Sequence, residues 1–130
     1  MSLPRDDALA RPDLNGAKSH LDLVLLGVLA IGPGHGYAII SELRERTDGV
    51  LDLPEGSVYP ALHRLEDLGL ITSEWKPVRG RRRREYRLTP DGATALASQR
   101  RDWNRLAGAV DAILGRGPQP TAGRLAGGLA

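Results

Sequence analysis

The sequence predicts a mainly α-helical fold with one small β-hairpin. Three observations support this fold class: apolar residues recur at helical spacing in three segments before residue 70, the spacing changes to alternation between residues 71 and 89, and a single long helical segment follows. A chain of 130 residues, 41% of them hydrophobic, is sufficient for one compact domain with an appendage. It is too short for a large buried enzyme cleft.

The composition excludes several classes of protein. There is no cysteine, which rules out disulfides and thiolate metal sites and fits a reducing compartment. The longest apolar run, Leu23–Ile31, is far shorter than the ~20 residues that a helix needs to cross a bilayer, and the N-terminus lacks the layout of a signal peptide. We therefore expect a soluble cytoplasmic protein with no cofactor, no metal site and no membrane partner.

The first predicted helix follows a short N-terminal arm. Residues 1–18 mix proline, glycine and charges without an apolar period and predict a flexible arm. Ser19 and Asp22 resemble a capping box, in which a hydroxyl and a carboxylate satisfy the open N–H groups at a helix start. The apolar residues that follow at helical spacing are Leu21, Val24, Leu25, Val28 and Leu29.

The stretch GPGHGYAI separates the first helix from the second. Its glycines and proline do not continue a helix easily, and its glycine spacing does not fit the dinucleotide-binding pattern G-x-G-x-x-G, so we interpret it as a turn. The second helix is predicted from about Gly36 to Arg46, with an apolar face made of Tyr37, Ile40 and Leu43.

The third predicted helix carries the first candidate contacts to a partner. Ser57 is suited to cap it, Pro60 is harmless in its first turn, and Gly69 is suited to end it. Its apolar stripe is Val58, Ala61, Leu62, Leu65 and Leu68. The opposite side could enter a DNA major groove, because it presents hydrogen-bonding groups near a helix N-terminus, namely Tyr59, His63, Arg64 and Asp67.

Positive charge is concentrated where the spacing changes to alternation. Six of the eighteen Lys and Arg residues lie in the stretch VRGRRRREYRLT, residues 78–89. Residues 72–90 hold seven basic and two acidic residues, a net charge of +5, so the rest of the chain carries −3 of the total of +2. A basic segment on a mildly acidic body indicates an anionic partner, nucleic acid first.

The alternation predicts a β-hairpin with strands at residues 71–76 and 84–89, a turn at residues 77–82, and Tyr86 and Leu88 facing inward. Three helices followed by a basic hairpin describe a winged helix-turn-helix domain over residues 19–89, in which the third helix reads bases and the wing contacts the backbone. The candidate DNA-binding residues are Ser57, Tyr59, His63 and Arg64 on the third helix and Arg81, Arg82, Arg83 and Arg84 on the wing.

Several of these candidates have a structural alternative. Tyr59 could instead pack between the first and third helices, and His63 could be an ordinary surface residue. Arg82 or Arg84 could pair with Glu74 across the hairpin. Trp75, on the first strand of the hairpin, is expected to have a packing role.

The apolar pattern of the last predicted helix, residues 90–114, indicates a homodimer. Thr89 is suited to cap it and Pro90 to be its first residue, and its length is about 38 Å at 1.5 Å per residue. Its apolar residues fall at heptad spacing over more surface than a small winged-helix domain can cover, and they are Leu96, Trp103, Leu106, Val110 and Ile113. The alternative is a helix folded back on its own domain. Residues 115–130, rich in Gly, Pro and Ala, predict a disordered tail.

Three segments of the sequence resemble the PadR family of bacterial transcriptional regulators: GHGYAIISEL, PEGSVYPALHRLEDLGLIT and GRRRREYRLTPDG, with a single long helix after them. The resemblance covers about residues 21–114 and points to the smaller subfamily with one C-terminal helix. It implies a homodimeric DNA-binding regulator, usually a repressor, that responds to a small-molecule ligand or to stress. A symmetric dimer would place two wings for a palindromic operator in double-stranded DNA.

The resemblance also implies a candidate ligand site. Some relatives bind flat aromatic molecules between tryptophans of the two subunits, and Trp103 lies where the resemblance places such a residue. The alternative is that Trp103 is plain core of the dimer seam.

Functions of other classes fit the sequence less well. His20, His35 and His63 lie in three different elements, and no hydrolase, metalloprotease or nucleotide-binding motif occurs, so an enzyme is not expected. A winged helix that binds RNA or an acidic protein is an alternative. A MarR-like regulator is another, although in that family helices flank the winged domain on both sides.

Overall fold

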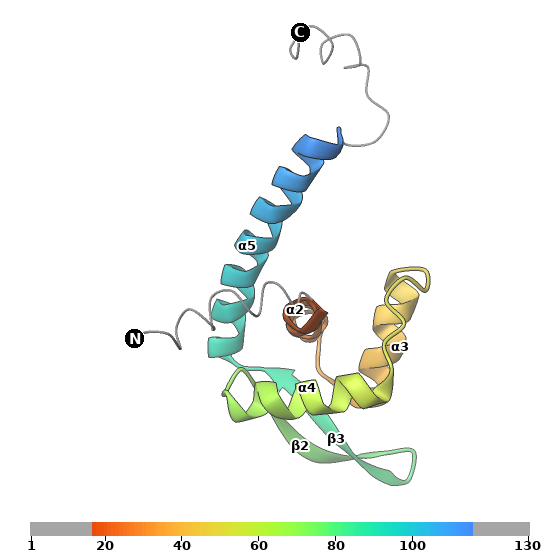
Figure 1. Cartoon of the computed structure of the whole chain (residues 1–130). Coiled ribbons are helices and arrows are strands. Elements are labelled where there is room, and N and C mark those ends of the chain that lie inside the picture. The colour runs from red at the N-terminus through yellow and green to blue at the C-terminus, as the bar shows by residue number, and fades with distance from the viewer. Residues whose placement is uncertain (1–16, 116–130) are drawn as a thin grey trace, which may run out of the picture. The chain divides into compact units, whose positions relative to one another are not determined.

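The computed structural model describes residues 17–115, with side chains from His20 onward, so the predicted arm and tail lie almost entirely outside the described residues. The elements run in the order α2 (Ala17–Ile31), β1 (Gly34–His35), α3 (Gly36–Arg46), α4 (Glu55–Asp67), β2 (Ile71–Val78), β3 (Arg81–Leu88) and α5 (Pro90–Leu114) (Figure 1). The predicted mainly α-helical fold with a small hairpin is confirmed. None of the described helices is long and apolar enough to span a membrane.

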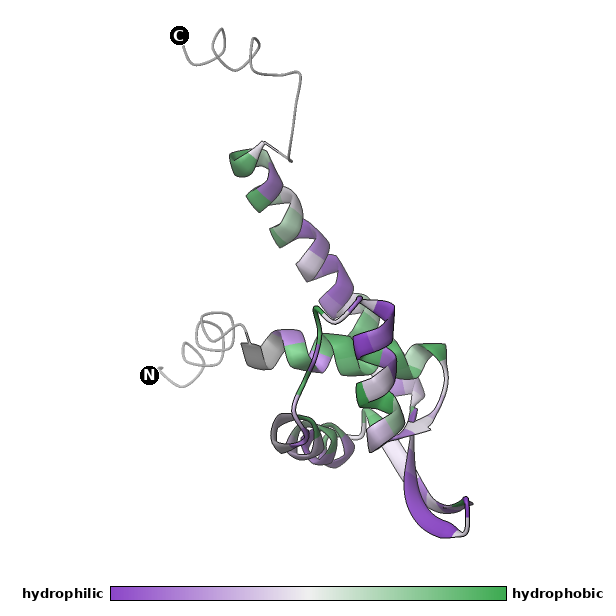
Figure 2. Ribbon diagram, turned by 90° about the vertical axis from the view of Figure 1, so that its right-hand side faces the viewer, coloured by the Kyte–Doolittle hydropathy of each residue, from purple (hydrophilic) through white to green (hydrophobic). Residues whose placement is uncertain are grey.

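The chain falls into two compact units, one ending at Ala97 and one beginning at Ser98. The core of the first unit is formed where one stripe of α2, α3 and α4 meets the sheet, and burying each large side chain there contributes about 1.5–3 kcal/mol. In Figure 2 the apolar colouring gathers on these helices, whereas the far end of the hairpin is hydrophilic. The core residues are Leu25, Leu26, Val28, Leu29, Ile39, Ile40, Leu43, Val58, Ala61, Leu62, Leu65, Ile71 and Tyr86.

The first two helices correct two details of the prediction. α2 begins two residues before Ser19, so Ser19 lies inside the first turn and is not the cap. α3 has the predicted bounds, but Tyr37 is 56% exposed, whereas Gly36, Ile39, Ile40 and Leu43 are buried. The helix period explains the difference: residues 36, 40 and 43 share one face, and residue 37 is turned by about 100° from residue 36.

α4 begins earlier than predicted. Its cap is Pro54, whose carbonyl accepts hydrogen bonds from the N–H groups of Ser57 and Val58, both at 3.0 Å, so Ser57 lies in the first turn and not at the cap. Pro60 is therefore the sixth residue of the helix, past the turn in which a missing N–H costs nothing. The carbonyl left without its helical donor belongs to Gly56, which is exposed to water.

The end of α4 confirms the predicted role of Gly69 but not that of Leu68. Gly69 has a φ of 78°, and the N–H groups of Gly69 and Leu70 donate to the carbonyls of Glu66 and Leu65 at 2.9 and 3.0 Å, the pattern of a Schellman motif. Leu68, predicted in the apolar stripe, is the C-cap residue and is 62% exposed, because the chain leaves the helix there.

The hairpin is longer and its turn tighter than predicted. β2 and β3 pair over eight residues each, so the predicted turn at 77–82 shrinks to Arg79 and Gly80. Both residues have positive φ, 52° and 78°, as a two-residue type I′ turn requires. Pro77 is tolerated in β2 because this is an edge strand, where a missing N–H breaks no ladder on its outer side.

A third strand was not predicted from the sequence. Gly34 and His35, interpreted as part of a turn, form β1 and pair antiparallel with Tyr86 and Glu85 of β3, giving the sheet order β1-β3-β2. Two residues are too few to display an alternating pattern, so no sequence signal distinguished this strand from a turn.

α5 has the predicted bounds, and its start is tied to the end of α4. The Thr89 hydroxyl oxygen accepts the Gly92 N–H at 3.0 Å, which confirms the predicted cap, and the hydroxyl donates to the Gly69 carbonyl at 2.7 Å. Ala95 and Leu96, still within the first unit, pack against the core. Leu96, predicted in a dimer seam, thus makes contacts within its own domain.

Gly92→Ala should destabilise the first unit. A Cβ at this position would lie 2.0 Å from the Leu70 carbonyl oxygen and 2.8 Å from Leu88 Cδ1. We expect the free energy of unfolding, measured by urea denaturation, to fall by about 2 kcal/mol or more, although alanine favours helix by about 1 kcal/mol. The matched control is Gly27→Ala in α2, where a Cβ meets nothing within 4 Å. Equal changes in the two variants would contradict the tight contact at Gly92.

Candidate nucleic-acid interface

Two neighbouring elements of the first unit, α4 and the β2–β3 hairpin, carry all the candidate contact residues (Figure 1). They differ in exposure. The exposed ones are Ser57, His63, Arg81 and Arg82, and the half-buried ones are Tyr59, Arg64, Arg83 and Arg84. The exposed group is available to a partner without rearrangement, and the contacts of the half-buried group indicate what each member does in the fold.

The beginning of α4 is open to solvent. No side chain caps it, so the N–H groups that precede Ser57 in its first turn are open to water or to a phosphate oxygen, whereas those of Ser57 and Val58 donate to the Pro54 carbonyl. Glu55 in the first turn stabilises the helix through the dipole but weakens its attraction for an anion. Ser57 and His63 are the predicted contact residues that project from this helix into solvent.

Tyr59 has a packing role. A Cβ added to Gly36 would lie 2.4–2.5 Å from Cε1, Cζ and the hydroxyl oxygen of Tyr59, so the ring rests directly on the first residue of α3. Only glycine allows this approach. The packing alternative is therefore right in kind, and this contact adds the second helix of the domain to it.

Arg64 is also held within the fold. Its Nη2 donates a hydrogen bond to Oδ1 of Asp22, which ties α4 to α2. Both side chains are partly buried, so breaking this pair would leave a charge poorly solvated. The two residues are 42 positions apart, and no local pattern in the sequence could have linked them.

The ladder register divides the wing into two faces. Because cross-strand partners share a face, Arg82 and Arg84 lie on the face of Ser73 and Trp75, and Arg81 and Arg83 lie on the other. On the first face Arg84 Nε donates to the Ser73 hydroxyl at 2.8 Å, and its Nη2 lies 3.8 Å from Oε2 of Glu66 on α4. The predicted alternative of a pair with Glu74 is thus wrong for Arg84, whose carboxylate partner is Glu66.

Trp75 lies among these arginines and is 52% exposed, so it does not have the packing role expected of it. The guanidinium carbons of Arg82 and Arg84 are each 5.2 Å from the centroid of its ring, within the range of cation–π attraction.

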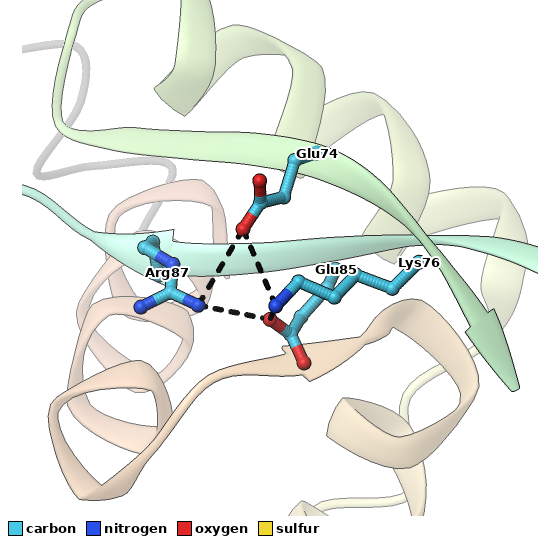
Figure 3. Close-up of polar contacts among 4 residues, drawn as sticks. All are labelled: Glu74, Lys76, Glu85 and Arg87. Atoms are coloured by element: carbon cyan, nitrogen blue, oxygen red, sulfur yellow. Dashed lines mark hydrogen bonds and ion pairs between the residues drawn. The ribbon is translucent and has the colours of Figure 1, made fainter.

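The base of the other face carries a self-neutralising network (Figure 3). Lys76 Nζ lies 3.5 Å from Glu74 Oε2 and 3.7 Å from Glu85 Oε1, and Arg87 Nη2 lies 3.8 and 2.9 Å from the same two oxygens. Two cations thus face two carboxylates. The positive charge of the wing is therefore effective mainly toward its tip.

The tip carries the guanidinium groups of the wing that have no carboxylate within 4 Å among residues 17–115, and they are Arg79, Arg81, Arg82 and Arg83. Arg79 was not among the candidates, although it belongs to the basic run that singled out the wing. Its position in the turn makes it part of the same surface. Within the described part of the chain, no group of three His, Asp or Glu side chains could hold a metal ion.

His35 connects the sheet to α3. Its Nδ1 accepts the N–H of Ala38 at 3.3 Å, which makes it the cap of α3, and it pairs with Glu85 across the β1–β3 ladder. Burial, and next the nearby Arg83 guanidinium, lower the pKa of His35, and Glu85 opposes this effect. The neutral ring is the form that can accept the capping hydrogen bond.

A family model and a curated relative that match this chain both describe transcriptional regulators. A family model described as "Transcriptional regulator PadR-like family" matches residues 25–98. "Transcriptional regulator Rv3488" of Mycobacterium tuberculosis is 54% identical over 52 residues, 40% of this chain, so the match spans about half (49%) of that relative's length.

Solved structures are similar over most of their length. A transcriptional regulator from Clostridium thermocellum, Cth-833, has a TM-score of 0.68 and 28% identity, over 75% of this chain and 92% of the other. A PadR family transcription regulator from Clostridium difficile R20291 has a TM-score of 0.65 and 30% identity, over 73% and 98%.

The His35 cap should make stability depend on pH. Because the pKa of His35 is lower in the folded protein than its ordinary value of 6.5, the unfolded chain takes up the proton first as the pH falls. The stabilising contribution is full above pH 6.5 and is lost as the pH falls through the lowered pKa.

We expect His35→Asn, which keeps a capping oxygen, to flatten the change in free energy of unfolding between pH 7.5 and 5.5, measured by urea denaturation. His63→Asn on exposed α4 is the control and should keep the slope of the unsubstituted protein. A slope unaffected by His35→Asn would contradict the assignment.

Proposed function

The chain belongs to the PadR-like family of transcriptional regulators, and on this premise we propose that it is a homodimeric, sequence-specific DNA-binding repressor that a small-molecule or stress signal releases from a palindromic operator. The family is one of transcriptional regulators and not of enzymes, and its assignment replaces the MarR-like alternative. The observation that carries the proposal is the group of wing-tip arginines that have no carboxylate within 4 Å among residues 17–115, on the hairpin next to α4.

In this proposal the wing tip contacts the DNA backbone. Arg79, Arg81, Arg82 and Arg83 need break no ion pair with a described residue to bind phosphate, and each contact would release condensed counterions. Ser57 and His63 on α4 contact base edges in the major groove. Tyr59, Arg64 and Arg84 act mainly by holding α4 and the wing in place, because each is engaged within the fold.

A homodimer is supported by the exposed apolar row of the second unit. Trp103, Leu106, Val110 and Ile113 recur at heptad spacing on α5 and are 42%, 51%, 43% and 84% exposed. A second copy of the helix, packed symmetrically, would remove this row from water. It would also provide two winged domains for the two halves of a palindrome.

The proposed effector is a flat aromatic molecule that binds beside Trp103. The support is the exposure of this indole together with the family assignment. Such a ligand releases DNA only if it binds more tightly to a dimer arrangement that does not fit the operator. A repressor of this kind would act in the cytoplasm, where bacterial DNA lies.

The test is titration of the full chain into a labelled duplex from upstream of its own gene, at near-physiological salt, with excess random DNA. Tight binding that resists the competitor supports a sequence-specific regulator. Binding that random DNA abolishes would count against the proposal for this site and would favour an RNA or acidic protein partner.

In the same titration, Arg81→Ala combined with Arg83→Ala should weaken binding to every duplex. The slope of log affinity against log salt should flatten by up to about 0.9 for each phosphate that the variant no longer neutralises. The matched control, Arg100→Ala combined with Arg101→Ala, removes the same charge from exposed positions of α5 and should change the slope much less. Equal changes in the two variants would indicate a general charge effect and no wing contact.

Trp103→Asp should convert the dimer to a monomer, because it places a charge in the apolar seam. Analytical ultracentrifugation measures the change. The control is Arg101→Asp, which adds the same acidic side chain at a position turned by about 200° from residue 103 and should leave the dimer intact. A stable dimer of the Trp103→Asp variant would contradict the seam proposed for α5.

A further inference from the structure

Trp75 is in an unusual place for a tryptophan. The hairpin is anchored to the core by Ile71 and Tyr86, which are buried, whereas Trp75 lies four residues beyond Ile71 on the same face and is 52% exposed. The guanidinium carbons of Arg82 and Arg84 each lie 5.2 Å from the centroid of its ring. A large aromatic ring that is half in water and next to two guanidinium groups does not serve the core.

The two arginines are held differently. Arg84 has further contacts: its Nε donates to the Ser73 hydroxyl, and its Nη2 faces Glu66 of α4 at 3.8 Å. The Ser73 hydroxyl in turn donates to Glu66 at 2.7 Å. Arg84 and the ring beside it are thus fixed to the third helix of the domain.

Arg82, in contrast, has no carboxylate within 4 Å in the described part of the chain, and its guanidinium carbon lies over the indole of Trp75, 5.2 Å from the ring centroid. The contacts therefore run without a break from Glu66 on α4 through Arg84 and Trp75 to Arg82 near the wing tip. Restraining a long side chain before binding lowers the entropy cost when it meets a phosphate.

We propose that Trp75 is a positioning residue that holds Arg82, through its ring, in the orientation in which this arginine contacts DNA. The inference rests on the proposed function and assigns within it a role to a residue that does not itself need to touch the nucleic acid. Arg81 provides an internal comparison, because it lies on the opposite face of the wing and has no aromatic ring of a described residue within cation–π range.

The first test is a double-mutant cycle on duplex affinity with the full chain. Trp75→Ala and Arg82→Ala should each weaken binding by about 3- to 10-fold, and the double variant should be little weaker than Arg82→Ala alone. The effects of Trp75→Ala and Arg81→Ala should instead multiply. Trp75→Phe, which keeps a ring, should restore most of the affinity.

If the effects of Trp75→Ala and Arg82→Ala multiply, the positioning role is overturned, and Trp75 acts independently, for example by stacking on the nucleic acid. Thermal unfolding of Trp75→Ala is measured alongside. A large loss of stability that Trp75→Phe does not repair would also overturn the proposal, because Trp75 would then be part of the fold.

The second test needs no DNA. In NMR spectra of the full chain, the side-chain protons of Arg82 should be shifted upfield by the indole ring current, and Trp75→Ala should abolish the shift, whereas those of Arg81 should be unaffected. An unshifted Arg82 in a protein that binds its duplex would overturn this inference and leave the proposed function standing. A shifted Arg82 in a protein that binds no duplex would overturn the proposed function. It would also overturn the role of the Trp75–Arg82 contact in DNA binding.

Discussion

Val58, Ala61, Leu62 and Leu65 are packed out of water on one face of α4, and the rest of the candidate interface depends on this burial. A helix that buries this stripe has only one orientation about its axis, and that orientation leaves His63 in solvent. It also turns Glu66 toward the hairpin, where the carboxylate accepts from Ser73 and faces Arg84. The hydrophobic effect is not directional, but on a helix the burial of one apolar stripe determines which polar side chains remain exposed.

The positive charge of the wing is neutralised at its base and concentrated at its tip. At its base, Glu74 and Glu85 neutralise Lys76 and Arg87, which secures the pairing of the strands without adding to the surface potential. At the tip the arginines have no such partners among residues 17–115. A net charge counted over the whole segment therefore understates how sharply the field is concentrated. The same division explains why two arginines that are adjacent in sequence, such as Arg83 and Arg84, have different surroundings.

Much of the fold could be predicted from the sequence because glycine and proline mark its boundaries. The bounds of α3 and α5 follow from Gly36, Pro90 and the Thr89 cap, and the Schellman turn follows from Gly69. The errors arose where the determinant is not local. The start of α4 at Glu55 depends on how Pro54 is placed by the preceding loop, β1 exists only because β3 is beside it, and the pair of Arg64 with Asp22 joins two helices far apart in the chain. Residue types on the α4 face suggested contacts with a partner, but only the tertiary structure distinguishes Ser57 and His63 from the engaged Tyr59 and Arg64.

The turn at Arg79 and Gly80 has a consequence for how such a wing can change over evolutionary time. Both residues have positive φ and connect two strands that remain paired up to the turn itself, so the hairpin holds no slack to absorb a change in length. Because strand residues alternate between faces, inserting or deleting one residue in β3 near the tip would exchange the faces of Arg81 and Arg82 and would remove Trp75 from its neighbour. Lineages that lengthen or shorten the wing would therefore be expected to do so two residues at a time.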